Sequence, residues 1–331
     1  MLEDRRLGSQ GLVVPAVGLG CMGMTGAYGK AGEAESVATI RRALEIGVTM
    51  FDTADVYGSF ANEELVGRAL AGRRDQAVVA TKFGGAELDS RGAAVGGANG
   101  RPEYVRTCVE RSLRHLGTDR IDVYYQHRVD PRVPVEETFG ALGELVAAGK
   151  VRYLGISEAR ADTIRRAHAT APLSVVESEY SLFARDMEAN GVLETTRELG
   201  IGFVASSPLG RGFLAGAVRS RSSLADDDLR CAFPRFEQEN LARNLRLLER
   251  VEEIAAARQA TSAGLALAWL LARGPGIVAI PGARRRAHLE ANERSAGLRL
   301  DDATLKALDD AVAPGEVAGT RTSPGDVDIE L

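Results

Sequence analysis

The chain has 331 residues, of which 45% are hydrophobic and 26% are charged, and its formal net charge at pH 7 is −5. This composition is typical of a globular protein with a large core, and the acidic balance argues against a nucleic-acid-binding surface. The length permits two domains, but single barrels of alternating strands and helices also reach this size.

The three cysteines, Cys21, Cys108 and Cys231, lie far apart in the sequence. Their spacing contains no metal-binding pair, and their odd number argues against a disulfide framework. The charged start MLEDRRLGSQ lacks the apolar segment of a signal peptide, and the longest apolar run, 265–272, is too short to cross a bilayer. We therefore expect a cytoplasmic protein without a bound metal and without membrane or nucleic-acid partners, either monomeric or homo-oligomeric.

Short apolar stretches rich in Val and Ile alternate with longer helical patterns along the chain. A hairpin is predicted first, over RRLGSQGLVV with its turn at SQG. The predicted strands then cover 14–20, 48–55, 77–83, 121–127, 151–157, 173–180, 201–208 and 276–282. The predicted helices cover 35–47, 62–70, 102–117, 135–150, 161–170, 190–200, 239–259, 262–273 and 285–297.

Eight strand-then-helix units without an evident linker predict an α/β fold, a single closed (β/α)8 barrel of the TIM type. We expect one domain over residues 1–331, with a core from about 5 to 312, the N-terminal hairpin placed where it can plug the barrel floor, and a C-terminal helix and tail. The tail, 313–331, is rich in Pro and Gly and is expected to pack as a loop or to fray. An open six-stranded sheet with an additional domain is the alternative.

The stretch VGLGCMGM, 17–24, has the G-x-G-x-x-G spacing of a dinucleotide-binding turn, formed by Gly18, Gly20 and Gly23. Such a turn needs a helix that begins at its third glycine and holds the pyrophosphate at its N-terminus. The chain instead continues with three more glycines and shows no helical pattern until about residue 36. We therefore interpret the stretch as a tight turn at a barrel mouth.

Polar residues stand at the C-terminal ends of the predicted strands, which is where barrel enzymes place their active sites. Asp52 and Lys82 end consecutive strands, His127 ends the next one, and Tyr57 lies in the loop just after Asp52. Each residue alone has a structural explanation: an ion pair for Asp52 and Lys82, rim packing for Tyr57, and a hydrogen-bonded core histidine for His127. Their joint position at one end of neighbouring strands favours a catalytic group.

The ordered motifs FDTADVYG, ATKF, DVYYQHR, GKVRYLGIS, ASSPLGRGFLAG and IPGARR…HLEAN resemble the aldo-keto reductase family, over nearly the whole chain. The resemblance is to the branch of bacterial and fungal enzymes related to potassium-channel β subunits. It implies a barrel that binds NADP(H) in an extended pose and a catalytic tetrad of Asp52, Tyr57, Lys82 and His127.

The chemistry of these side chains is consistent with that tetrad. When a hydride reaches a carbonyl carbon, negative charge develops on the oxygen, and Tyr57 is the proton donor. We expect the Lys82 ammonium to lower the pKa of Tyr57 from about 10 toward neutrality. Asp52 would keep Lys82 charged and in position, and His127 would donate a hydrogen bond to the carbonyl oxygen.

The resemblance also assigns the cofactor contacts. Ser157 would bind the nicotinamide carboxamide, and the backbone of SPLGRG with Arg211 would hold the pyrophosphate. Arg284, His288 and Asn292 are predicted on one helix face, where charge binds a 2′-phosphate and the amide binds adenine; together with Arg285, this favours NADP(H) over NAD(H). The full predicted set is Gly20, Met22, Ser157, Glu158, Glu177, Ser206, Ser207, Pro208, Leu209, Gly210, Gly212, Gly282, Arg284, His288 and Asn292.

The chain departs from the family pattern at three positions. Glu177 replaces a glutamine that binds the nicotinamide amide, and a carboxylate can only accept hydrogen bonds unless it is protonated. Ser206 replaces an aromatic residue, which removes about 1–3 kcal/mol of stacking. Ala291 replaces an acid that contacts adenine. These departures bear on cofactor affinity more than on the chemistry.

The long loops 84–100 and 213–240 are the predicted substrate-contacting segments. The first is rich in Gly and Ala and is expected to be mobile, and the second carries Phe233 and Phe236, either as walls for an apolar substrate or as anchors of the loop. The main hypothesis is an NADPH-dependent reductase of a small aldehyde or ketone. The alternatives are an NADPH-binding, redox-sensing regulatory subunit with slow turnover, and a barrel isomerase or lyase without a nicotinamide cofactor.

Overall fold

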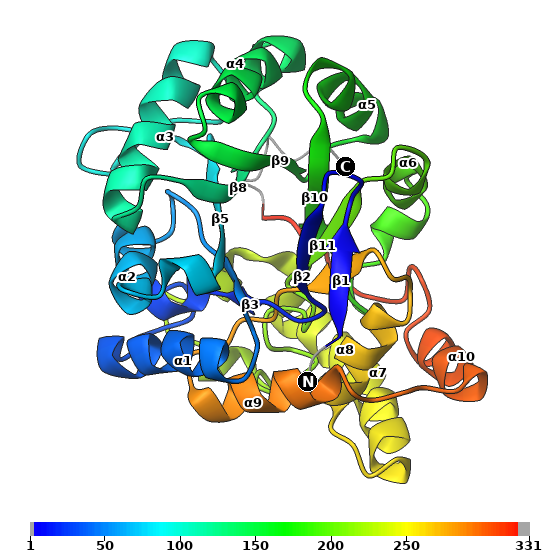
Figure 1. Cartoon of the computed structure of the whole chain (residues 1–331). Helices are drawn as coiled ribbons and strands as arrows, with labels where there is room; N and C mark the ends of the chain where they lie inside the picture. Colours follow the sequence, from blue (N-terminus) through cyan, green and yellow to red (C-terminus); the bar gives the residue numbers. More distant parts are fainter. Residues whose placement is uncertain (1–2, 324–331) are drawn as a thin grey trace.

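The computed structural model describes residues 3–323, and its centre is an eight-stranded parallel sheet (Figure 1). Each strand pairs with the strand that comes next to it in the chain, so the sheet follows the order of the sequence. The strands are β3 (Leu19–Gly20), β4 (Met50–Asp52), β5 (Val78–Phe83), β8 (Ile121–Gln126), β9 (Val151–Ser157), β10 (Leu173–Glu179), β11 (Gly202–Ser206) and β12 (Ile277–Ala279).

The first and last parts of this sheet meet and close it into a barrel. Val17 forms a parallel bridge with Ala279, and Gly20 forms one with Gly282. The amide of Gly18 donates to the carbonyl of Ala279 at 2.8 Å. The predicted (β/α)8 barrel is therefore confirmed, and the alternative of an open six-stranded sheet is wrong.

Helices surround the barrel and cover the outer face of the parallel strands (Figure 1), while side chains inside the barrel cover the inner face. Local signals set their ends; for example, Pro102 lies in the first turn of one helix, and Gly117 ends it with φ of 62°. The helices are α1 (Glu33–Glu45), α2 (Ala61–Leu70), α3 (Pro102–Leu116), α4 (Val135–Ala147), α5 (Ala161–Thr170), α6 (Val192–Glu198), α7 (Gln238–Ala257), α8 (Ser262–Leu271), α9 (Arg286–Ser295) and α10 (Asp302–Ala311).

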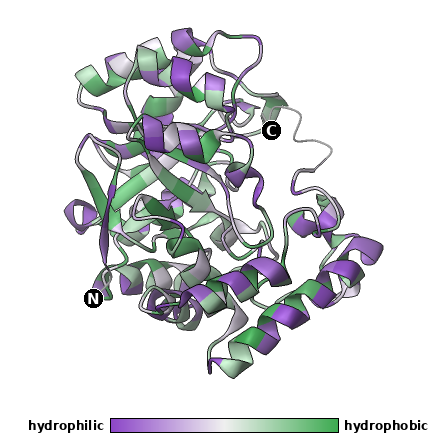
Figure 2. Cartoon of the chain, turned by 90° about the vertical axis from the view of Figure 1, so that its right-hand side faces the viewer, coloured by the Kyte–Doolittle hydropathy of each residue, from purple (hydrophilic) through white to green (hydrophobic). Residues whose placement is uncertain are grey.

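Apolar side chains fill two separate regions, one between strands and helices and one inside the barrel. Figure 2 shows the hydrophobic colouring concentrated on the central strands, whereas the outer helices also carry hydrophilic residues. Inside the barrel the ring of Tyr125 has room only because residue 155 is a glycine; a Cβ at Gly155 would lie 2.3 Å from that ring. The barrel interior is thus a packed core.

The N-terminal hairpin closes the bottom of this interior. Strands β1 (Asp4–Leu7) and β2 (Leu12–Pro15) are antiparallel, and Leu7 and Leu12 belong to the cluster inside the barrel. A Cβ at Gly202 would lie 2.7 Å from Leu7, which shows how closely the hairpin meets β11. The predicted hairpin and its place on the barrel floor are confirmed.

The two long loops at the other end are more regular than the sequence indicated. The 84–100 loop contains an antiparallel pair, β6 (Glu87–Leu88) and β7 (Ala94–Gly96). The 213–240 loop contains three short 3-10 helices: η4 (Arg221–Ser223), η5 (Leu229–Ala232) and η6 (Pro234–Phe236).

The C-terminal tail packs against the barrel as far as the structure describes it. The amide of Ala318 donates to Oδ1 of Asn244 at 2.8 Å, and Arg321 is buried. The rest of the predicted tail, 324–331, lies outside the described residues. Within 3–323, no helix is both long enough and apolar enough to cross a membrane.

Candidate active site

The four predicted catalytic residues meet at the C-terminal end of the barrel. Asp52 ends β4, Lys82 is the penultimate residue of β5, His127 follows β8, and Tyr57 lies in the loop after β4. The parallel strands bring these ends to one rim of the barrel, as the fold requires. The structure thus brings all four positions together.

Lys82 is fully buried and forms an ion pair with Asp52. Its Nζ also donates to the carbonyl of Thr53 at 3.1 Å. Although burial lowers the pKa of an ammonium group, Asp52 and then Glu177 raise the pKa of Lys82 above its ordinary value. Lys82 is therefore a fixed cation at neutral pH.

Glu177, which was predicted only as a cofactor contact, reaches the same cation. Its Oε1 lies 3.4 Å from Nζ of Lys82, and its side chain is 5% exposed. Because β10 is three strands away from β5 in the sheet, this contact crosses the barrel interior. The tetrad region therefore holds a second carboxyl group beside the one on Asp52.

Tyr57 faces this cluster. Its ring centroid lies 5.5 Å from Nζ of Lys82 and 5.9 Å from the ring centroid of His127, to which it is nearly perpendicular. Burial raises the pKa of Tyr57 to about 12; Lys82 lowers the pKa, but Asp52 and Glu177 oppose Lys82. The expectation of a pKa near neutrality is therefore wrong for the cofactor-free protein, because burial and two carboxyl groups outweigh the cations of Lys82 and Arg128.

His127 is held as a neutral ring. Burial lowers its pKa well below the ordinary value, and the cations Arg128 and Lys82 lower it further. A Cβ at Gly85 would lie 2.7 Å from Nδ1 of His127, so the glycine allows the loop to lie against the ring. A neutral imidazole retains one N–H that can donate a hydrogen bond.

The predicted cofactor residues lie along the same rim, from the turn after β3 to the start of α9. Gly20 pairs with Gly282 where the barrel closes, and Met22 lies in the 3-10 helix η1 (Met22–Thr25). In the part of the chain that the structure describes, the first α-helix, α1, begins at Glu33, well after Gly23. This agrees with rejecting a dinucleotide-binding turn of the G-x-G-x-x-G type. Ser206 and Ser207 are half-buried at the end of β11.

The loop SPLGRG is a tight turn with several left-handed residues. Ser207, Gly210, Arg211 and Gly212 have φ of 46°, 56°, 57° and 89°. The amides of Gly210 and Gly212 donate within the loop, to the carbonyls of Ser207 at 2.8 Å and of Leu209 at 3.1 Å. Pro208 and Leu209 complete the turn, so two of its amides hold the loop together.

Ser157 and Glu158 have different surroundings, although they are adjacent at the end of β9. Oγ of Ser157 accepts from Nη1 of Arg128 at 3.4 Å. Oε2 of Glu158 accepts from Arg321 at 2.8 Å, and its Oε1 accepts from the amide of Glu179 at 2.8 Å. Glu158 is therefore engaged by the C-terminal tail, whereas Ser157 faces the rim of the site.

The predicted helix face of Arg284, His288 and Asn292 needs a correction. Helix α9 begins at Arg286, so Arg284 precedes the helix, and its Nη1 donates to the carbonyl of Tyr28 at 2.8 Å. His288 and Asn292 lie four residues apart within α9 and so share a helix face as predicted, with His288 exposed and Asn292 buried. The extended residue Arg285 at the helix N-cap separates Arg284 from the helical repeat.

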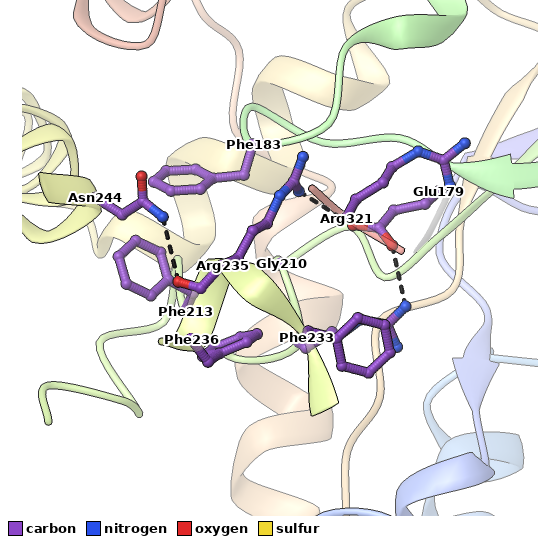
Figure 3. Close-up of a pocket in the computed structure, with 10 residues that line it drawn as sticks. Glu179, Phe183, Gly210, Phe213, Phe233, Arg235, Phe236, Asn244 and Arg321 are labelled. Atoms are coloured by element: carbon purple, nitrogen blue, oxygen red, sulfur yellow. Dashed lines mark hydrogen bonds and ion pairs between the residues drawn. The ribbon is translucent and has the colours of Figure 1, made fainter. Parts of the chain in front are cut away.

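A small cavity of about 10 Å³ lies behind the SPLGRG loop (Figure 3). This volume has room for about one water molecule, so the cavity is too small for a substrate. The guanidinium of Arg211 lies 4.1 Å from the ring centroid of Phe233, and Phe213 contacts Phe236 edge-on. Of the two roles considered for Phe233 and Phe236, the structure supports the one as anchors of the loop.

Three residues near the site were not predicted. Arg128 donates to the carbonyl of His127 at 2.7 Å and also reaches Ser157. The ring of Tyr125 lies 5.5 Å from Nζ of Lys82, and the alternation of side chains along β8 from His127 would have found it. Arg321 had no local signal, because its contacts depend on the path of the tail.

No group of three or more His, Cys, Asp or Glu residues within 3–323 is arranged to hold a metal ion. Ion pairs join Asp52, Lys82 and Glu177 at the centre of the site, beside the phenol of Tyr57 and the imidazole of His127. A phenol beside a fixed ammonium can protonate a carbonyl oxygen, and a neutral imidazole nearby can polarise the same oxygen by donating a hydrogen bond.

Comparison with known proteins agrees with this chemistry. Residues 16–313 match the Aldo/keto reductase family, and the chain belongs to this family of oxidoreductases, whose activity in general is carbonyl reduction. Among its relatives, probable aldo-keto reductase 1 of Glycine max is 48% identical over 97% of this chain and 92% of that protein. The NADP(+) aldo-keto reductase yakc of Schizosaccharomyces pombe is 42% identical over 98% and 95%.

Solved structures show the same fold. The glycerol dehydrogenase of Gluconobacter oxydans superposes with a TM-score of 0.84 and 30% identity, over 94% of this chain and 95% of that one. An aldo/keto reductase from Klebsiella pneumoniae, solved in complex with NADP and acetate, gives a TM-score of 0.72 and 27% identity, over 95% and 96%.

Proposed function

We propose that this protein reduces a small aldehyde or ketone to an alcohol with NADPH, and that Tyr57 supplies the proton. The observation that carries the proposal is the cluster of Tyr57, Lys82, Asp52 and His127 at one rim of the barrel. The match to the family over residues 16–313, and relatives aligned over 97% and 98% of the chain, support one reductase domain over residues 1–331.

The residues present fit a nicotinamide cofactor. The glycines of the SPLGRG turn, together with the paired Gly20 and Gly282, leave backbone without side chains that a pyrophosphate can approach closely. The names of the Schizosaccharomyces relative and of the Klebsiella complex both include NADP. Arg284 and the exposed Arg285 supply positive charge for a 2′-phosphate. In this proposal, Ser157 and Glu177 contact the nicotinamide end of the cofactor.

When bound, NADPH supplies the hydride that reaches the carbonyl carbon. Tyr57 holds its proton across the neutral range and gives it to the oxygen as negative charge develops there. Lys82 stabilises the phenolate that Tyr57 becomes, and Asp52 keeps Lys82 in place. His127, as a neutral ring, donates a hydrogen bond to the same oxygen.

Replacement of the proton donor tests this function. We expect Tyr57→Phe to lower kcat by about 10²- to 10⁴-fold and to leave the Kd for NADPH nearly unchanged, because the ring remains and only the acid is lost. Stopped-flow turnover of an aldehyde panel and NADPH fluorescence titration measure the two quantities. Tyr153→Phe, on β9 near the barrel floor, is the matched control and should keep both values.

Two outcomes would contradict the proposal. If the Tyr57→Phe variant keeps the kcat of the wild type, Tyr57 is not the proton donor. NADPH binding by the wild type without turnover of any carbonyl compound would favour the redox-sensing regulatory subunit instead.

A further inference from the structure

Two carboxyl groups share one ammonium in the interior of this barrel. Asp52 forms the closer ion pair with Lys82, and Oε1 of Glu177 lies 3.4 Å from the same Nζ. Asp52 is 3% exposed and Glu177 is 3% exposed, so neither carboxyl group is hydrated by bulk water. A hydrogen bond between the carboxyl groups of Asp52 and Glu177 also contributes to the pKa of each.

The charge of this cluster decides its protonation. With both acids ionised, two anions and one cation would leave a net negative charge in a dry interior, which is costly. Neighbouring carboxylates that lie this close do not both ionise, and one keeps a proton. Asp52 has the shorter contact with the cation, so the proton belongs on Glu177, from which it can be donated to Asp52.

The remaining groups around Glu177 do not supply a second positive charge. The neighbouring strands β9 and β11 place Ser157 and Val204 beside it in the register. Further along β10, Glu179 is already paired with Arg211 at 3.1 Å and with Arg235 at 3.5 Å. The other titratable groups beside Asp52 and Lys82 are Cys21, Tyr57, Tyr125 and His127. The cation Arg128 acts on Tyr57 and His127.

We propose that Glu177 shares one proton with Asp52 over Lys82 and thereby makes the preference of the site for NADP⁺ or NADPH depend on pH. This inference rests on the proposed function, which places the nicotinamide against a carbonyl carbon held at Tyr57. The oxidised nicotinamide is cationic and the reduced ring is neutral. An ionised Glu177 beside it therefore favours the oxidised form, and a protonated one removes that preference.

The direction of the proton equilibrium supports the argument. Burial raises the pKa of Glu177, and the neighbouring Asp52 raises it further, while Lys82 opposes both. Glu177 therefore keeps its proton up to neutral pH and loses it in alkaline solution. A glutamine at this position has no such equilibrium, because an amide stays neutral throughout this range.

The first measurement concerns the proton itself and needs no cofactor. Infrared difference spectra of the cofactor-free protein at pH 7 should show a buried carboxylic-acid band that disappears in Glu177→Gln and that the wild type loses as pH rises. Glu63→Gln is the matched control, since Glu63 is another buried acid. This variant should lose the band of Glu63 and keep the band of Glu177. A band unaffected by Glu177→Gln overturns the shared proton, regardless of what the protein reduces.

The second measurement concerns the cofactor. The ratio of the Kd for NADPH to the Kd for NADP⁺ should rise by on the order of 10- to 100-fold between pH 6 and 9.5 in the wild type, at an effective dielectric constant of about 20. The ratio should be flat in Glu177→Gln. The 2′-phosphate titrates in both forms, so its contribution cancels. A flat wild-type ratio, or the same slope in the variant, overturns the inference, whereas failure of the proposed function appears in the Tyr57→Phe experiment.

Discussion

Glu63 on α2 is a buried acid whose environment opposes ionisation. Its Oε1 accepts from Oγ1 of Thr81 at 2.7 Å, yet burial raises its pKa to about 7. Because the folded pKa lies above the ordinary value, this group stabilises the fold fully only below about pH 4.5, and the contribution is lost as pH rises through about 7.

Glu63→Gln should therefore gain stability relative to the wild type between pH 5 and pH 8. The unfolding free energy of the variant minus that of the wild type should rise by on the order of 3 kcal/mol from pH 5 to pH 8, because each pKa unit corresponds to about 1.4 kcal/mol. Urea unfolding at the two pH values measures it. Glu103→Gln is the control, since its side chain is 74% exposed and pairs with the guanidinium of Arg101, which stays charged over this range; an equal response of both variants would reject the role of burial.

The sequence predicted individual site residues well where strand position alone fixes them. Asp52, Lys82 and His127 were found because strand ends share one rim. The contact of Glu177 with Lys82 was not found, because it crosses the barrel interior between strands that are not neighbours. The pKa of Tyr57 was predicted in the wrong direction, since burial cannot be judged from a sequence pattern.

The hairpin of β1 and β2 is the element that seals the barrel floor. Leu7 is fully buried and contacts the position of Gly202, whereas Val13 on the same hairpin is 45% exposed. Leu7→Ala should lower the unfolding free energy by about 2–5 kcal/mol, because it leaves a cavity among packed side chains.

Chemical denaturation of Leu7→Ala and Val13→Ala measures this effect. Val13→Ala should change the free energy by less than about 0.5 kcal/mol, since its side chain faces solvent. Similar losses in the two variants would show that the hairpin does not act as a plug. Element types were predicted from periodicity, but the β6–β7 pair was missed because the 84–100 loop is rich in glycine and lacks an apolar repeat.

At the scale of the whole molecule, the C-terminal tail is tied to the site through Arg321. This buried guanidinium donates to Glu158 and to Asp186, each at 2.8 Å. Removing one member of a buried ion pair leaves an uncompensated charge, so Arg321→Ala should cost about 3–5 kcal/mol.

Thermal unfolding and limited proteolysis of the tail measure the loss in Arg321→Ala. Arg299→Ala is the control, because its ion pair with Glu3 lies on the surface and should contribute about 0–1 kcal/mol. Unchanged stability of Arg321→Ala would show that the tail is not held by this contact. The barrel itself was predictable from eight repeated units, but the path of the tail depends on long-range ion pairs that no local pattern encodes.

The closure between Gly20 and Gly282 joins the first and last strands by isolated bridges alone, unlike the continuous ladder between β8 and β9. Backbone pairing over so few residues is a place where local opening costs little free energy. Both glycines belong to the proposed dinucleotide contacts, so a bound molecule spans the join and holds its two edges together. Cofactor binding and stability are then coupled. Protein saturated with cofactor should resist heat and proteolysis better than the same protein without cofactor.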